Sequence, residues 1–77
     1  MKESDFVENF ASQFEDVDPS VVTMETNFRN VEGWSSFTAL SIIAMVDELY
    51  NVKITRNDIK NAKTVRELFN LVQERKK

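Results

Sequence analysis

The sequence predicts an all-α fold, a small bundle of four helices in which three helices are longer and one is short. The 77 residues include one glycine and one proline, which leaves little material for the tight turns of β-hairpins. Apolar residues recur at helical spacing, and hydroxyl residues stand where several of those patterns begin. A chain of this length holds one core, so residues 1–77 are expected to form a single domain.

The first helix is expected to begin with Ser4 as its N-cap. Its apolar positions are Phe6, Val7, Phe10 and Phe14. The segment 16–20 ends the pattern, because Pro19 restricts the preceding residue and lacks a donor. This segment is only faintly similar to a calcium-binding loop, since Val21 and Asn27 stand where such a loop has glycine and glutamate. We therefore expect no metal site.

A long loop is expected over residues 16–34, between the first and second helices. It has no sustained period, yet it holds the apolar residues Val21, Val22, Met24, Phe28 and Val31. A loop of this composition is expected to pack against the core rather than to extend into solvent. Phe28 and Trp34 are expected to be the aromatic residues that fasten it to the bundle.

The segment from Ser36 to about Tyr50 is predicted to be the most hydrophobic helix. Its apolar face consists of Ala39, Ile42, Ile43, Val46, Leu49 and Tyr50, and it is widened by Phe37, Leu40 and Ala44. Because this face is wider than a small bundle needs, some of its side chains are expected to contact a partner or to line a cavity. Ser35 and Ser36 stand at the helix start, where a serine is by default an N-cap.

Two capping-box patterns predict the last two helices. Thr55, followed by Asp58, opens a short helix that is expected to end at Asn61. Thr64, followed by Glu67, opens a longer helix. The apolar positions of that longer helix are Val65, Leu68, Phe69 and Val72.

The composition excludes several classes of function. The chain has no cysteine and no histidine, so it lacks disulfides, Ser-His and Cys-His nucleophile pairs and the usual zinc ligands. We therefore expect no catalytic residue and no enzymatic activity. The net charge of -3 disfavours nucleic acid as a partner. The polar N-terminus and the lack of any run of about 18 apolar residues predict no signal peptide and no membrane insertion, hence a cytoplasmic protein.

Short motifs follow one another in a fixed order from the second helix onward. They are Ser35-Ser36-Phe37, an apolar run from Thr38 to Val46, the acids Asp47-Glu48, then Val52-Lys53-Ile54 and Thr64-Val65. This order resembles the acyl carrier protein family without a gap and over nearly the whole chain. The resemblance implies a four-helix bundle of the acyl-carrier type.

The resemblance also implies a covalent cofactor. It places the family's modified serine at Ser36, to which a phosphopantetheinyl transferase attaches 4′-phosphopantetheine from coenzyme A. The thiol of this arm would carry acyl cargo as a thioester between acyl-loading, condensing or acyltransferase enzymes, with the protein a monomer. At a helix N-terminus the amides and the macrodipole favour the phosphodiester charge, so no dedicated basic pocket is expected.

Partner docking is implied at a further set of positions on and before the second helix. They are Ser35, Phe37, Leu40, Ser41, Ala44, Asp47 and Glu48. Ser35 stands where the family has aspartate and Ser41 where it has a recognition glutamate, so this face is less acidic than in fatty-acid carriers. Positive charge gathers later in the chain, at Lys53, Arg56, Lys60, Lys63 and Arg66. Partners that bind a continuous acidic strip are therefore expected to bind poorly.

The cargo and the pathway stay open at this point. The arm could serve fatty-acid synthesis or a dedicated lipid or secondary-metabolite pathway. Aminoacyl, D-alanyl and peptidyl carriers share the fold and the serine. Because Ser35 replaces the family's aspartate, an unmodified helical interaction module is a further alternative.

Overall fold

The computed structural model describes residues 2–15 and 17–76, and it confirms the all-α prediction. The elements are α1 (Glu3–Ala11), the 3₁₀ turns η1 (Pro19–Val21) and η2 (Phe28–Asn30), α2 (Ser36–Tyr50), α3 (Arg56–Asn61) and α4 (Val65–Arg75). The described residues contain no strand. No helix in this part of the chain is long and apolar enough to cross a membrane.

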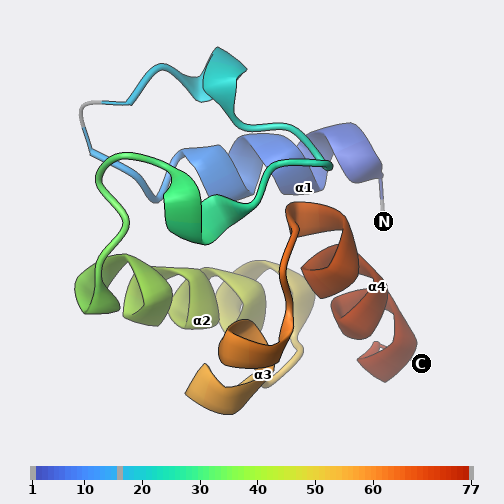
Figure 1. Ribbon diagram of the computed structural model, residues 1–77. Coiled ribbons are helices and arrows are strands. Elements are labelled where there is room, and N and C mark those ends of the chain that lie inside the picture. Colours follow the sequence, from blue (N-terminus) through green and yellow to red (C-terminus); the bar gives the residue numbers. More distant parts are fainter. Residues whose placement is uncertain (1, 16, 77) are drawn as a thin grey trace.

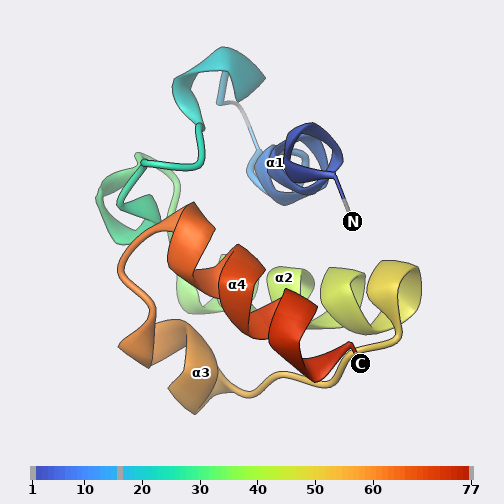
Figure 2. The ribbon, with the colours of Figure 1, turned by 90° about the vertical axis from the view of Figure 1, so that its right-hand side faces the viewer.

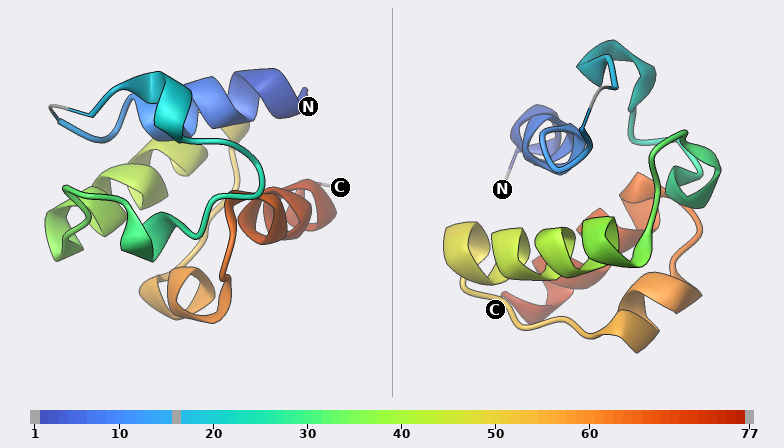
Figure 3. Two further views of the ribbon diagram at one scale, coloured as in Figure 1. Left: turned by 45° about the horizontal axis from the view of Figure 1, so that its top comes forward. Right: turned by 90° about the vertical axis from the view of Figure 1, so that its left-hand side faces the viewer.

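The four helices enclose one core (Figure 1). α2 contacts both α1 and α3, and α1 also contacts α4. The long connection between α1 and α2 carries η1 and η2 along the side of the bundle and reaches the start of α2 (Figures 2 and 3). The start of α2 is therefore held by the loop before it and by α3 beside it.

Aromatic rings link α1 to the loop inside the core. Phe28 is fully buried, and its ring centroid lies 5.4 Å from that of Phe10 and 5.1 Å from that of Trp34. Trp34 is half-buried and also lies 6.1 Å from Phe14. The expected fastening of the loop by Phe28 and Trp34 is thus confirmed.

The loop is also bound to α4 through its backbone. The carbonyl of Met24 accepts from the Arg66 amide at 2.8 Å, and the carbonyl of Thr26 accepts from the Val65 amide at 3.1 Å. These amides belong to the first turn of α4, where no intrahelical acceptor is available. Val22 and Met24 are buried as expected and Val31 is half-buried, but Val21 is 54% exposed, so its prediction as a packed residue was wrong. Val21 ends η1 on the outer side of the loop.

The start of α1 differs from the prediction. Lys2, not Ser4, is the N-cap, and it provides no side-chain cap. The first turn already closes at Lys2, because its carbonyl accepts from the Phe6 amide at 3.1 Å. Glu3, now in the first turn, forms an ion pair with Arg66 of α4 at 3.2 Å. The helix also ends earlier than predicted, at Ala11, so the buried Phe14 follows it and is not one of its positions. Asp16, in the segment predicted to end the helix, lies outside the described residues.

Both later capping signals mark helix starts, as predicted. Thr55 and Asp58 form the complete reciprocal box at α3, which ends at Asn61. At α4 the Thr64 hydroxyl accepts from the Glu67 amide at 3.2 Å. The Glu67 carboxylate, however, accepts from the amide of Lys63, one residue before the cap. Of the second predicted capping box, therefore, the bond to the Thr64 hydroxyl forms as expected, whereas the Glu67 carboxylate binds an amide one residue earlier than expected.

Candidate functional site

The two serines at the start of α2 have different roles. Ser35 is the N-cap, with an extended backbone, and its hydroxyl oxygen accepts from the Thr38 amide at 3.2 Å. The Thr38 hydroxyl donates to the Gly33 carbonyl at 3.1 Å. Because that bond uses the only hydroxyl proton of Thr38, the Ser35 hydroxyl is the donor in their 3.2 Å contact. Ser35 is thus held in a local hydrogen-bond network.

Ser36 is the first residue of α2, and it is exposed. Its hydroxyl has no hydrogen-bond partner among residues 2–15 and 17–76. Of the two serines that could cap α2 by default, Ser35 is the one that does so. This leaves the Ser36 oxygen accessible at the positive end of a 15-residue helix.

The turn before α2 depends on the single glycine. Gly33 has a φ of +94°, a conformation that side-chain-bearing residues rarely adopt. A Cβ at this position would also lie 3.4 Å from a methyl carbon of Val17. The turn directs Trp34 against the core aromatics and places Ser35 in the cap position.

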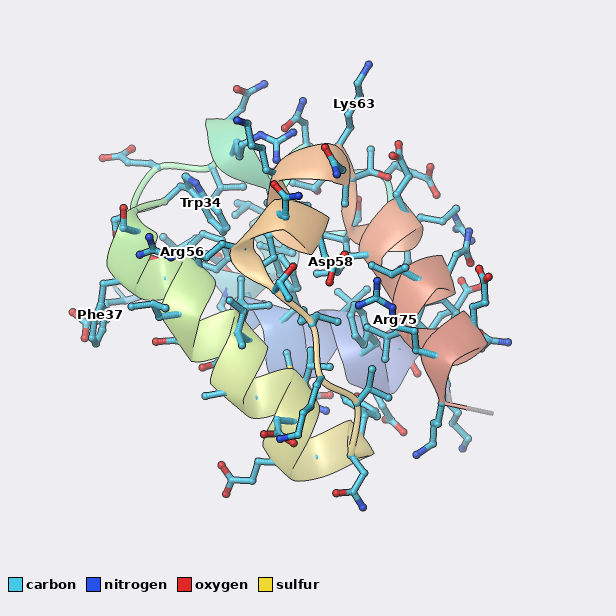
Figure 4. The ribbon with its side chains drawn as sticks, turned by 90° about the horizontal axis from the view of Figure 1, so that it is seen from below. Trp34, Phe37, Arg56, Asp58, Lys63 and Arg75 are labelled. Carbon is cyan, nitrogen blue, oxygen red and sulfur yellow. The ribbon has the colours of Figure 1, made fainter. Side chains whose placement is uncertain are left out.

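A shallow pocket of about 250 Å³ lies beside Ser36, between the start of α2 and α3. Its lining residues are Arg29, Trp34, Ser35, Ser36, Ala39, Arg56, Ile59 and Lys60. No acidic residue is among them. Figure 4 shows Arg56 extending toward the start of α2, near Trp34. The sequence indicated a basic cluster in this part of the chain, but it did not indicate that two of its members would share a pocket with Ser36.

One wall of this pocket is α3, which is tied to its neighbours by two arginines. The Arg75 guanidinium of α4 binds the Asp58 carboxylate at 2.6 and 3.0 Å (Figure 4). These hydrogen bonds, together with that from the Thr55 amide, hold the pKa of Asp58 below its usual range against the opposing effect of burial. Arg29 donates to the Ile59 carbonyl at 2.8 Å. Neither contact could be predicted from the sequence, because each arginine is far along the chain from the residue that it binds.

The predicted docking residues fall mainly on one face of α2. Phe37, Leu40, Ala44 and Glu48 are exposed, and Ser41 is half-buried among them. Their spacing places them along one side of the helix. Phe37 is 70% and Leu40 48% exposed, so these two large apolar side chains lie open to solvent.

The remaining predicted docking positions lie apart from this row. Asp47 forms an ion pair with Lys53 at 3.3 Å. Ser35 is the N-cap of α2. The structure therefore places the apolar residues of the predicted docking set together, near Ser36, and places the acidic residues at the far end of the helix.

The comparisons with known proteins are consistent with this geometry. A family model described as a phosphopantetheine attachment site matches residues 5–72, which is most of the chain. No curated protein shows significant sequence similarity to the chain.

Proposed function

We propose that Ser36 bears the 4′-phosphopantetheine of this chain, which belongs to the family of phosphopantetheine attachment-site domains. The observation that carries this proposal is the division of roles between the two serines. The Ser35 oxygen is used as the helix cap, whereas the Ser36 hydroxyl is exposed and has no partner among the described residues. Ser36 can therefore react without loss of the cap.

The chemistry requires little of the serine itself. The Ser36 oxygen attacks the phosphorus of coenzyme A that bears the pantetheine; a new P–O bond forms and the pyrophosphate bond breaks. Adenosine 3′,5′-bisphosphate leaves, and the serine proton passes to a base of the phosphopantetheinyl transferase. The first-turn amides of α2 and its macrodipole favour the resulting negative charge. Ser36 is thus a substrate and an anchor, and the bound arm supplies the thiol that carries cargo as a thioester.

The surface of α2 supports partners that dock through apolar contacts. We name Phe37, Leu40 and Ala44 the apolar docking face. From Ser36 to Val46 the helix carries no charged residue, so an acidic strip beside the attachment point is lacking. This favours acyl-loading, condensing or acyltransferase enzymes of a dedicated cytoplasmic lipid or secondary-metabolite pathway over those of bulk fatty-acid synthesis.

Mass spectrometry of the loaded protein identifies the class of cargo. An acyl group, an aminoacyl group and a peptidyl group on the arm differ in the mass of the loaded protein recovered from the native host. Recovery of the unmodified protein alone would favour an unmodified interaction module instead.

The attachment site is tested by incubating the purified protein with coenzyme A and a broad-specificity phosphopantetheinyl transferase and measuring its intact mass. The wild type and Ser35→Ala are expected to gain one phosphopantetheine each, and Ser36→Ala is expected to gain none. Ser35→Ala is the matched control, because it removes a neighbouring hydroxyl. An adduct that persists in Ser36→Ala, or a wild type that gains none, contradicts the proposal.

A further inference from the structure

The pocket beside Ser36 carries two cations on one edge of α3. Arg56 and Lys60 are four residues apart, so they are neighbours on the helix surface. Both are exposed, both line the pocket, and neither forms an ion pair or a side-chain hydrogen bond among residues 2–15 and 17–76. Like charges at this spacing destabilise a helix unless an anion lies between them.

The other basic residues of this region either form ion pairs elsewhere or point away from the pocket. Arg66 pairs with Glu3 at 3.2 Å and with Glu25 at 2.7 Å, and Lys53 pairs with Asp47. Lys63 has no ion-pair partner in the described part of the chain, but it points outward, away from Arg56 (Figure 4). Among the described residues, Arg56 and Lys60 are therefore two unpaired cations on the pocket that Ser36 also lines.

The surroundings leave this positive charge uncompensated. The pocket has no acidic lining residue, and the first turns of α2 are uncharged. Arg29, a third cation on the pocket, donates to the Ile59 carbonyl, and its guanidinium carbon lies 5.2 Å from the Phe28 ring centroid. Arg29 is thus fixed within the wall, while the side chains of Arg56 and Lys60 remain available to a ligand.

We propose that Arg56 and Lys60 bind the phosphodiester oxygens of the arm attached to Ser36. This inference rests on the proposed attachment site. Because Ser36, Arg56 and Lys60 line the same pocket, a phosphodiester on the Ser36 oxygen would place its anionic oxygens on the pocket that carries the two cations. Arginine binds phosphate with a planar fork and lysine as a point charge. Trp34, Ala39 and Ile59 offer apolar surface to the carbon chain that follows. The expectation that no basic pocket accompanies the site is replaced by this pair.

The test compares apo and holo forms of the wild type and of Arg56→Gln/Lys60→Gln at low ionic strength, each converted fully as judged by intact mass. The difference in Tm, holo minus apo, is expected to be smaller in the double variant by about 2 to 6 °C, the shift that exposed ion pairs produce in a domain of this size. High salt is expected to abolish this effect in the wild type. The ³¹P resonance of the holo wild type is expected to move with salt, and that of the double variant is not.

Two variants control for charge and for side-chain identity. Lys53→Gln/Lys63→Gln removes the same net charge away from the pocket and is expected to keep the wild-type difference in Tm. Arg56→Lys/Lys60→Arg retains both charges and is expected to keep it as well. A holo-minus-apo difference that is equal in the wild type and in Arg56→Gln/Lys60→Gln overturns this inference alone. Absence of any adduct on the wild type overturns the proposed function and this inference together.

Discussion

At the scale of the residue, the two adjacent serines show how one position along a helix start changes a side chain's role. Ser35 has the extended backbone of a cap, and its oxygen faces the Thr38 amide. Ser36 is the first residue of the helix, and its exposed hydroxyl has no hydrogen-bond partner in the described part of the chain. An aspartate at position 35, as in the family, would cap equally well. The serine therefore preserves the cap and removes one negative charge beside the proposed attachment point.

This assignment predicts distinct stabilities for three variants. Ser35→Ala is expected to lower the free energy of unfolding by about 1 kcal/mol, because the Thr38 amide loses its acceptor. Ser35→Asp is expected to match or exceed the wild type by up to about 0.5 kcal/mol, since a carboxylate caps and also interacts with the macrodipole. Ser36→Ala is expected to change stability by less than about 0.5 kcal/mol. Urea denaturation measures all three, and a larger loss in Ser36→Ala than in Ser35→Ala would refute the assignment of the cap.

At the scale of the element, α3 is a short helix held by contacts from outside itself. Its six residues are too few to be stable alone. Ile59 is buried, Arg29 binds the Ile59 carbonyl, and Arg75 binds the Asp58 carboxylate that also completes the capping box. These contacts position the helix that carries the cationic pair of the pocket.

The Asp58–Arg75 pair predicts a pH dependence of stability. The pKa of Asp58 is lowered in the folded protein, chiefly by the hydrogen bonds from Arg75, from an ordinary value of 3.8. The folded state therefore binds the proton less well than the unfolded state, and the contribution of this carboxylate is present above the ordinary pKa and lost as the pH falls below it. Urea denaturation across the acidic range is expected to show this loss.

The variant Asp58→Asn isolates the effect. It is expected to lower the free energy of unfolding near neutral pH by about 1 to 2 kcal/mol, because a charged acceptor of several hydrogen bonds is replaced. It is also expected to flatten the dependence of stability on acidic pH. Glu32→Gln, which neutralises an exposed carboxylate of the loop, is the control and is expected to leave the wild-type profile in place. An acidic profile that is identical in the wild type and Asp58→Asn would show that the pair contributes nothing.

At the scale of the whole molecule, the long connection is part of the core. Phe28 joins Phe10 of α1 to Trp34 at the start of α2, and the loop carbonyls accept from the first amides of α4. The loop thereby links α4 to the two helices that it connects in sequence, α1 and α2. Loss of this packing is expected to disturb the start of α2, and with it the proposed attachment site.

Phe28→Ala tests this coupling. It is expected to cost about 3 to 5 kcal/mol, because it removes a fully buried ring and leaves a cavity. This is a large part of the about 5 to 15 kcal/mol that stabilises a typical domain. Hydrogen exchange is expected to show faster exchange of the Val65 and Arg66 amides, which the loop protects. Phe37→Ala, at an exposed position, is the control and should change stability by less than about 0.5 kcal/mol. Equal losses in the two variants would contradict the role of Phe28.

The helical class, the order of the elements and the approximate limits of α2, α3 and α4 could all be predicted from the sequence. Those features depend on contacts three or four residues apart, between apolar positions on one face or between a cap and the amide it accepts from. The resemblance to the acyl carrier protein family, and not local spacing, predicted Ser36, Phe37 and Leu40 as residues of a site. The local patterns misplaced the start of α1, because Lys2 caps that helix without a side-chain signal.

Long-range packing settles which basic residues are paired and which line the pocket beside Ser36. Arg66 pairs with residues of α1 and the loop, Arg75 pairs with α3, and Arg56 and Lys60 remain on the pocket. The tertiary structure also decided that the loop would cap α4 through its carbonyls. These contacts join segments that are distant in the chain, so no local spacing encodes them. They follow from the way in which the buried faces of the helices pack together.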